Sequence, residues 1–225
     1  MVLAFSLAVF LLRNQAKTKG LDTDLFFNLS FVVLVSGIIG ARILYIILNL
    51  GYYFSCPKEI ILFSKGGLAW FGGLISGSIA FIVYLKRRHL GVYAIADLVI
   101  PYVALAQCIG RIGCFLNGCC FGKETQGLGV HFPNHAAILI PTQIYSSFAL
   151  LMIFVILKIM QSGQQRNGAI LYSYLFLYSI WRFFIEFLRG DTRIFIFGLT
   201  VFQIFSLVLF VLSVVMLLKT KKIQN

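Results

Sequence analysis

Long apolar runs separated by short polar segments make up most of the chain, and they predict membrane-spanning helices. A helix needs about 20 consecutive apolar residues to cross a bilayer. We expect seven spans, over residues 1–12, 25–50, 67–85, 92–121, 142–157, 168–188 and 195–218. The first run is short and resembles the apolar core of a signal peptide, but no small-residue cleavage site follows Leu12. We therefore interpret it as a truncated first helix that lacks its beginning.

The composition agrees with this pattern. Of the 225 residues, 60% are hydrophobic and 12% are charged, which excludes a soluble domain of this length. The loops are too short for a separate soluble domain. We expect an all-α polytopic membrane protein in which residues 1–225 form a single integral membrane domain.

The net charge of +12 does not indicate nucleic-acid binding, because the basic residues lie in short loops and in the tail. One set of loops and the tail carry Arg13, Lys17, Lys19, Lys86, Arg87, Arg88, Lys158, Arg166, Lys219, Lys221 and Lys222. The other set carries fewer: Lys58, Lys65, Lys123, Arg189 and Arg193. The positive-inside rule then places the C-terminus in the cytoplasm and the N-terminus outside.

Arg42, Arg111 and Arg182 lie inside stretches that are otherwise apolar. A charge at the centre of a bilayer costs at least about 2.5 kcal/mol. Such side chains are expected to face a cavity, a partner or an anionic ligand. For Arg42 a second interpretation stays open, in which its side chain extends to the outer membrane surface.

Residues 110–122 make the fourth span irregular, with Pro101 before them and glycines at 110, 113 and 118. Irregular backbone at membrane depth is tolerated where it lines an enclosed cavity. We expect the helix to break here and this stretch to line the site near the outer face.

Tyr174, Tyr178, Arg182 and Glu186 recur every four residues in the sixth span. Helical geometry places them on one face. This face is either a wall of a ligand cavity or a structural ion pair between Arg182 and Glu186, and the sequence does not choose between them. Asp97 is expected to start a helix or to bond a neighbouring helix.

The remaining candidates have simple structural interpretations. The glycine pairs 66–67 and 72–73 are expected to be helix-packing points. The cysteines at 114, 119 and 120 match no common zinc spacing. Cys119 and Cys120 are left open between small apolar residues and a disulfide. The histidines, at 89, 131 and 135, are expected to face solvent, and no metal site or cofactor is predicted.

Several of these motifs together resemble the prolipoprotein diacylglyceryl transferase family, a family of seven-span bacterial inner-membrane enzymes. The resemblance covers nearly the whole chain, and the similar segments follow in the same order. They are residues 40–45, 67–75, 96–98, 110–122 and 141–145, followed by the positions Tyr178, Arg182 and Glu186. The chain departs from the main form of the family at four positions. The family histidine of the third helix is Phe71, the signature asparagine and glutamate are Cys114 and Cys119, and a later histidine is Ile140. This Cys-Cys form is similar to a divergent branch of the family.

The resemblance implies transfer of diacylglycerol from phosphatidylglycerol to the lipobox cysteine thiol in a prolipoprotein signal peptide. It implies Arg111, Arg182 and Glu186 as catalytic residues. It implies that substrate is bound by Arg111, Asn117, Gly122, Tyr178, Arg42, Tyr45 and Gln143. The proton acceptor is left open, since Phe71 replaces the histidine. Two alternatives also stay open: a non-catalytic lipid-binding relative, and a membrane thiol oxidoreductase that uses Cys119 and Cys120.

Overall fold

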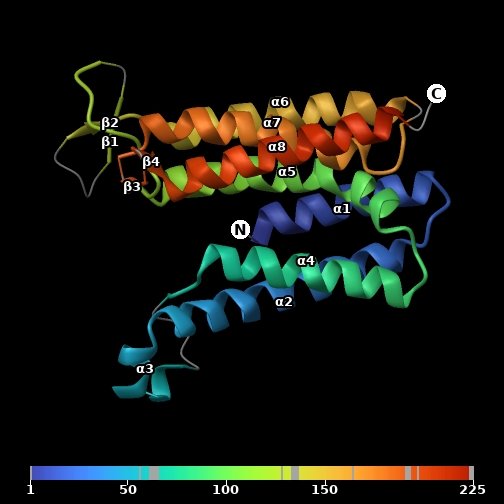
Figure 1. Cartoon of the computed structure of the whole chain (residues 1–225), viewed down its shortest axis with the longest axis horizontal. Helices are drawn as coiled ribbons and strands as arrows, with labels where there is room; N and C mark the ends of the chain where they lie inside the picture. Colours follow the sequence, from blue (N-terminus) through green and yellow to red (C-terminus); the bar gives the residue numbers. More distant parts are fainter. Residues whose placement is uncertain are drawn as a thin grey trace. The chain divides into compact units, whose positions relative to one another are not determined.

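The computed structural model describes residues 2–55, 57–60, 66–127, 129–132, 137–163, 165–190, 194–196 and 198–222. The chain is mostly helical (Figure 1). The longer helices are α1 (Val2–Thr18), α2 (Thr23–Leu48), α4 (Trp70–Arg87), α5 (Val92–Leu116), α6 (Thr142–Ser162), α7 (Ala169–Ile185) and α8 (Val201–Lys222). The short elements are α3 (Leu50–Ser55), η1 (Pro57–Ile60), η3 (Glu186–Leu188) and the strands β1 (Val130–His131), β2 (Ile138–Leu139), β3 (Ile194–Ile196) and β4 (Leu199–Thr200).

Five of the described helices are long and apolar enough to cross a membrane: α2, α5, α6, α7 continued through η3, and α8. Helix α1 has 17 residues, and the 18 residues of α4 end on Lys86 and Arg87. The prediction of a helical polytopic membrane protein is confirmed. The structure supports five of the seven expected spans by length and composition.

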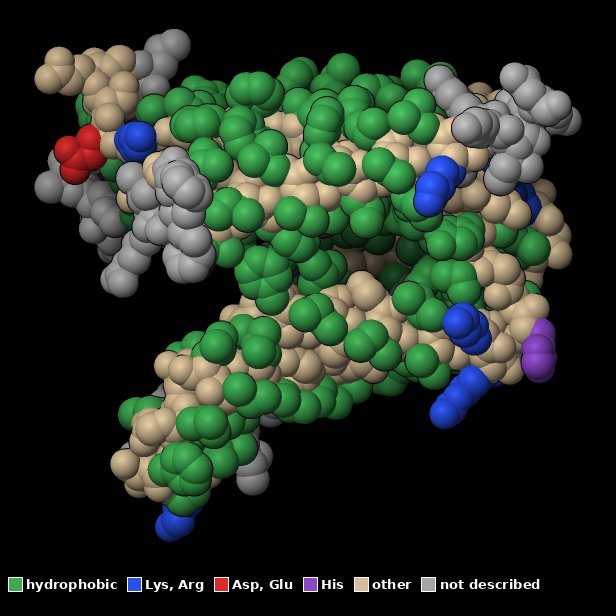
Figure 2. Space-filling view, in the orientation of Figure 1, with side chains coloured by type: hydrophobic (Ala, Val, Ile, Leu, Met, Phe, Trp, Pro, Cys, Tyr) green, Lys and Arg blue, Asp and Glu red, His purple; other side chains and the backbone are tan. Residues whose placement is uncertain are grey.

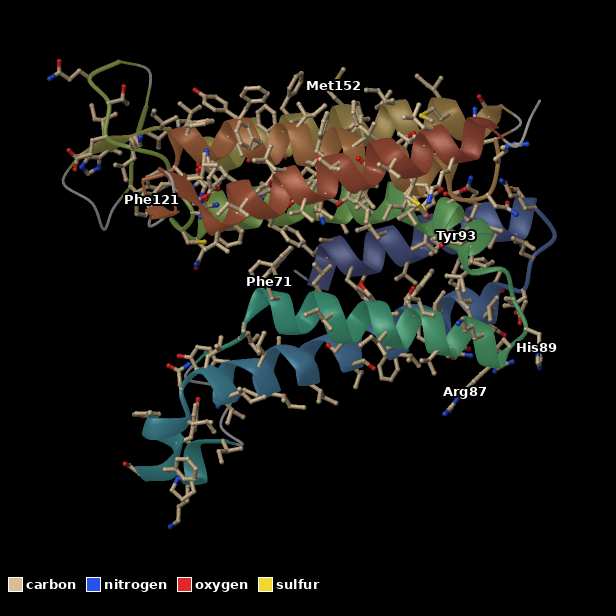
Figure 3. The ribbon with its side chains drawn as sticks, viewed as in Figure 1. Phe71, Arg87, His89, Tyr93, Phe121 and Met152 are labelled. Carbon is tan, nitrogen blue, oxygen red and sulfur yellow. The ribbon has the colours of Figure 1, made fainter. Side chains whose placement is uncertain are left out.

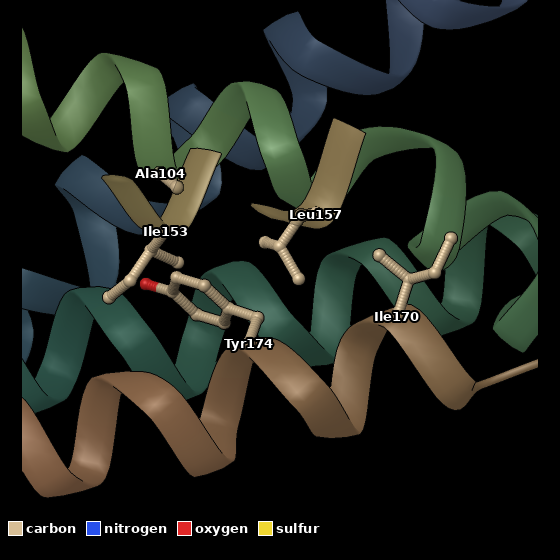
Figure 4. Close-up of a cluster of buried hydrophobic side chains, with 5 residues drawn as sticks. All are labelled: Ala104, Ile153, Leu157, Ile170 and Tyr174. Carbon is tan, nitrogen blue, oxygen red and sulfur yellow. The ribbon is translucent and has the colours of Figure 1, made fainter. Parts of the chain in front are cut away.

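The chain divides into two compact units, residues 13–92 and residues 1–12 with 93–225. In the second of these, α7 packs against α6 and α8. Ala104 of α5 joins Ile153 and Leu157 of α6 and Ile170 and Tyr174 of α7 in a buried apolar cluster (Figure 4). Apolar side chains also cover the outer faces of these helices, as expected for surfaces that meet lipid (Figure 2). Met152 is one of them and points away from the bundle (Figure 3).

Asp97 bonds α5 to the start of α7. Its Oδ2 accepts a hydrogen bond from the backbone N–H of Gly168 at 2.6 Å, and its Oδ1 accepts one from Leu171 at 2.8 Å. The first N–H groups of a helix have no partner within that helix, so the carboxylate caps them. The expected role of Asp97 in bonding a neighbouring helix is confirmed.

The expected break inside the fourth span is wrong. Helix α5 continues through Gly110 and Gly113 and ends at Leu116 rather than at residue 121. Glycine in a helix costs about 1 kcal/mol, and these two glycines do not end α5. Gly118, two residues beyond the last residue of the helix, has a left-handed φ of 64°. The seventh helix also begins later than expected, at Val201, because residues 194–196 form strand β3 paired with β4.

In the unit of residues 13–92, α2 and α4 pack through small residues. A side chain on Gly72 would overlap the carbonyl of Gly40, and one on Gly73 would lie 3.3 Å from the carbonyl of Gly37. Ser76 Oγ donates across the same contact to the carbonyl of Ser36 at 2.9 Å. The packing role expected for the pair 72–73 is confirmed. The pair 66–67 lies outside the helices, in the segment before α4, with positive φ at both glycines, so the expectation that it is a helix-packing point is wrong.

Candidate functional site

Arg182 and Glu186 form a buried ion pair at the end of α7. Arg182 Nη2 lies 2.9 Å from Glu186 Oε2, and the side chain of Glu186 is fully buried. Thr200 Oγ1 donates to Glu186 Oε1 at 2.9 Å, so each carboxylate oxygen has a protein contact. The Arg182 guanidinium also lies 4.6 Å from the ring centroid of Phe202 on α8, within cation–π range. The carboxylate and the ring hold this guanidinium in one orientation.

Two further arginines, Arg189 and Arg111, lie close enough to act on this pair. Arg189 Nε lies 3.9 Å from Glu186 Oε2. Arg111 and Arg189 both act electrostatically on Arg182, in the direction of like-charge repulsion. Among the described residues, the guanidinium groups of Arg182 and Arg189 lie within ion-pair distance of the carboxylate of Glu186. Such a cluster favours an added anion, and guanidinium forks match phosphate oxygens.

Gly122 holds the loop after α5 against the end of α7. It forms a backbone bridge with Arg189, and Lys123 N donates to Leu188 O at 2.8 Å. A side chain at Gly122 would lie 2.7 Å from the Leu188 carbonyl and 2.8 Å from Ile140 Cβ. Glycine is required here for this close approach. The contact fixes the backbone beside the arginine cluster.

Gln143 and Thr142, at the start of α6, hold the preceding part of the loop. Gln143 Nε2 donates to the carbonyl of Cys119 at 2.7 Å, and Thr142 Oγ1 donates to that of Cys120 at 2.9 Å. Gln143 is fully buried, and its Oε1 has no hydrogen-bond partner within the described part of the chain. Gln143 thus positions the loop that follows α5.

The tyrosines of α7 continue the same helix face. Tyr174 and Tyr178 stack with ring centroids 5.6 Å apart, and Tyr174 donates to Gln107 Oε1 on α5 at 2.8 Å. Tyr178 is half-buried and lies one helical turn before Arg182. Tyr174, Tyr178, Arg182 and Glu186 therefore follow one face of α7 and its continuation, as the helical spacing predicts.

Asn117 lies at the rim of this region. It is exposed and lines a cavity of about 310 Å³ with Phe115 on one side and His131 and Phe132 on the other. Phe121 packs on Phe132 from the same loop (Figure 3). His131 is exposed, as expected, whereas His135 lies outside the described residues.

Arg42 and Tyr45 belong to the other unit, where Arg42 binds backbone. Its guanidinium donates to the carbonyls of Glu59, Ile60, Gly66 and Gly67 at 2.7–3.2 Å. Arg42 is 5% exposed and is held by protein carbonyls, and its extension to the outer membrane surface stays a prediction. Tyr45 lies against Gly67 and forms an edge contact with Tyr53. These two side chains shape the segment that precedes α4.

Sequence reasoning missed several contributors to this site. Arg189 was assigned only to a loop, and Thr200, Phe202 and Gln107 were not singled out. Their signal was weak, because a lone threonine or phenylalanine in an apolar run has no distinctive spacing. Arg189 lies three residues after Glu186, a helical neighbour spacing that could have identified it.

Comparisons with known proteins identify the family to which the chain belongs. A family model described as prolipoprotein diacylglyceryl transferase matches residues 1–219. A phosphatidylglycerol–prolipoprotein diacylglyceryl transferase of Clostridium tetani is 40% identical over 193 residues, which covers 83% of this chain and 77% of that protein. The enzyme of the same name from Lactobacillus acidophilus is 33% identical over 239 residues, covering 99% and 84%. The one from Streptococcus agalactiae is 32% identical over 229 residues, covering 97% and 88%. The chain belongs to the prolipoprotein diacylglyceryl transferase family.

Proposed function

We propose that this chain transfers the diacylglyceryl group of phosphatidylglycerol to the lipobox cysteine thiol of prolipoproteins. One observation carries the proposal: the guanidinium of Arg182 is held by a buried ion pair with Glu186, on a helix apolar enough to lie in a membrane. The names of the related enzymes give the donor and the acceptor class.

The reaction breaks the C–O bond between the diacylglycerol carbon and the phosphate oxygen. The acceptor sulfur forms a C–S bond to that carbon, and glycerol phosphate leaves with the electron pair of the broken bond. The thiol loses its proton, so the products are a thioether, glycerol phosphate and one proton. Negative charge grows on the leaving phosphate, and fixed cationic donors stabilise it in the transition state.

Arg111 and Arg182 bind the phosphate in this proposal, and Glu186 positions Arg182. Both oxygens of Glu186 already contact protein groups, so its carboxylate acts as an orienting charge rather than as a proton acceptor. Tyr178 and Asn117 supply polar contacts beside the head group. Gln143 and Gly122 hold the loop, and Arg42 with Tyr45 shapes the segment before α4 in the other unit.

The acceptor thiol must react as its thiolate. Its ordinary pKa is about 8.5, and nearby guanidinium groups lower the pKa of a cysteine by stabilising the anion. The guanidinium groups that hold the phosphate therefore also stabilise the thiolate form of the acceptor. This arrangement needs no histidine at position 71, where α4 carries Phe71 (Figure 3).

The proposed topology places the site at the outer face of the bacterial inner membrane. In this topology the chain has seven spans, with the N-terminus outside and the C-terminus in the cytoplasm. The C-terminal end of α5, the start of α6, the end of α7 and the start of α8 share one end of their unit (Figure 1). Lys158, Arg166 and Lys219 lie toward the opposite end, where the positive-inside rule places the cytoplasm.

A transfer assay tests the function. The purified chain is placed in vesicles of phosphatidylglycerol labelled in its acyl chains, with a synthetic lipobox peptide. We expect label on the cysteine peptide and none on the matched serine peptide. Vesicles of phosphatidylethanolamine serve as the donor control and should give no transfer. Absence of label on the cysteine peptide, with a correctly folded protein, would overturn the proposed function.

A further inference from the structure

Three cysteine thiols meet at the end of α5. The Sγ atoms of Cys114, Cys119 and Cys120 all lie within 4.8 Å of one another. None of these residues takes part in the transfer reaction proposed above. The cluster consists of good ligands for soft metal ions, since thiolates bind such ions strongly.

The way α5 ends explains why these thiols meet. The backbone N–H of Cys119 donates to the carbonyl of Cys114 at 3.1 Å, and that of Gly118 donates to Phe115 at 3.1 Å. With Gly118 left-handed at φ 64°, this is a Schellman motif. The motif folds the residue after the glycine back over the last turn of the helix. It thereby brings Cys119 onto Cys114, although five residues separate them in sequence.

Backbone contacts hold the cluster in place. Cys120 has φ 63°, a left-handed conformation that is rare for a residue other than glycine. The carbonyls of Cys119 and Cys120 accept hydrogen bonds from Gln143 and Thr142. A strained backbone held by neighbouring side chains is typical of functional sites. The three side chains are half-buried, so an ion can reach them.

We propose that Cys114, Cys119 and Cys120 bind one thiophilic divalent cation, of which Zn²⁺ and Cd²⁺ are the probes. Sulfur ligands about 2.3 Å from a tetrahedral zinc ion lie about 3.8 Å apart, and the three Sγ atoms lie within 4.8 Å of one another before any ion binds. Binding converts three thiols and one divalent cation into a complex of net charge −1 and releases three protons. Three thiolates leave the fourth position of a tetrahedral ion open to water.

Metal binding would also affect the transfer reaction, a consequence that rests on the proposed function. Arg111 precedes Cys114 by three residues, on the same helix face, and acts on it electrostatically. The anionic metal complex would attract the Arg111 guanidinium and weaken its contact with the lipid phosphate. We therefore expect the bound cation to inhibit transfer.

Titration with Cd²⁺ tests the site directly. The full chain, reduced with a phosphine and solubilised in detergent, is followed by its ultraviolet thiolate-to-cadmium charge-transfer band. We expect the band to saturate at one Cd²⁺ per chain. Each single variant, Cys114→Ser, Cys119→Ser or Cys120→Ser, removes one ligand and should weaken binding at least about 100-fold, because the effective concentration of the remaining ligands no longer supports three-point binding.

Cys108→Ser is the matched control, because Cys108 lies in the same helix and its sulfur contacts Ser147 Oγ at 3.2 Å, outside the cluster. It should bind Cd²⁺ like the unchanged chain. Absence of the band in the unchanged chain, or equal weakening by Cys108→Ser, would overturn the proposal.

A measurement on the unchanged chain avoids any folding defect of the variants. Alkylation of its thiols, mapped by mass spectrometry, should be blocked by Cd²⁺ at Cys114, Cys119 and Cys120 together. Alkylation that proceeds at these positions in saturating Cd²⁺ would contradict the site.

Inhibition of transfer is measured separately with Cd²⁺ or Zn²⁺. Binding without inhibition would reject only the link to Arg111, and an inactive chain that still binds Cd²⁺ would reject only the proposed function.

Discussion

The buried carboxylate of Glu186 determines how Arg182 can act. A carboxylate and a guanidinium that are removed from water together stabilise each other, whereas either one alone is costly by about 3–5 kcal/mol. Thr200 and Arg189 add further contacts to the same carboxylate. The pair is therefore both a structural element and a means of presenting one guanidinium to a ligand. This joins the two interpretations that the helical spacing left open.

Arg182 and Glu186 should differ in their effect on transfer. Arg182→Ala removes a phosphate contact and should lower the transfer rate at least about 100-fold. Glu186→Gln keeps an oxygen that can accept from Thr200 and leaves the phosphate contact in place, so it should lower the rate less. Initial rates at equal amounts of folded protein measure both. A larger loss in Glu186→Gln would instead make Glu186 the proton acceptor or a head-group ligand.

The cysteines should be dispensable for transfer in metal-free buffer. The attacking thiol belongs to the substrate, so Cys119→Ser and Cys120→Ser should keep the transfer rate to within about tenfold, or about 1.4 kcal/mol of barrier. A thiol oxidoreductase would lose activity wholly, because serine is a far weaker nucleophile and forms no disulfide. Rates measured with and without reductant separate the two. Complete loss in either variant, at normal membrane levels, would favour a covalent or redox role.

At the residue scale, the sequence draws attention to charges that stand in apolar runs. Arg111, Arg182 and Glu186 were found because burying a charge demands a partner. Thr200, Phe202 and Gln107 were missed because they belong to other helices, and the sequence contains no distances between helices. Arg42 was found as a buried charge, but its partners are carbonyls of a turn, which no side-chain pattern reveals.

At the scale of the elements, close helix contacts depend on where glycines stand. In α2 and α4 the backbones approach so closely that a methyl group at Gly72 would overlap the carbonyl of Gly40. Lipid offers apolar side chains no better partner than other lipid, so small residues and close contact supply much of the association. The sequence predicted this packing from the pair 72–73. It did not predict that α5 stays helical through Gly110 and Gly113, because a cost of about 1 kcal/mol per glycine does not by itself decide where a helix ends.

Gly72→Ala should destabilise the contact between α2 and α4 by about 1–3 kcal/mol, the usual cost of overpacking. Thermal unfolding of the detergent-solubilised protein measures the change. Gly77→Ala is the matched control, since its added methyl group would lie 3.6 Å from Val33, an ordinary contact distance. We expect Gly77→Ala to be neutral or slightly stabilising, because alanine favours helix. Equal loss in both variants would show that the close contact at Gly72 is not what stabilises this pair.

At the scale of the whole molecule, the function depends on which end of the helices faces outward. The arginine cluster lies at the end of α5 and α7, and the acceptor thiol of a secreted precursor arrives from the outer face. The class of protein followed from the apolar runs alone. The number of spans was harder to predict, since α1 and α4 have lengths near the minimum for crossing a bilayer.

Reporter fusions test the orientation. An enzyme that is active only outside the cytoplasm, fused after Asn225, should be silent. The same reporter fused after Glu124, in the loop beside the site, should be active and serves as the matched control. An active fusion at Asn225 would place the arginine cluster at the cytoplasmic face, away from its proposed substrate.

Stoichiometry in a single preparation tests the central claim most directly. Vesicles of doubly labelled phosphatidylglycerol report glycerol phosphate release and thioether formation on a lipobox peptide at the same time. The unchanged chain should form the two products in equal amounts, and Arg111→Ala, at equal levels of folded protein, should lower both at least about 100-fold, because a phosphate contact made in the transition state is lost. Equal rates in the unchanged chain and in Arg111→Ala, or glycerol phosphate released without thioether, would contradict the account.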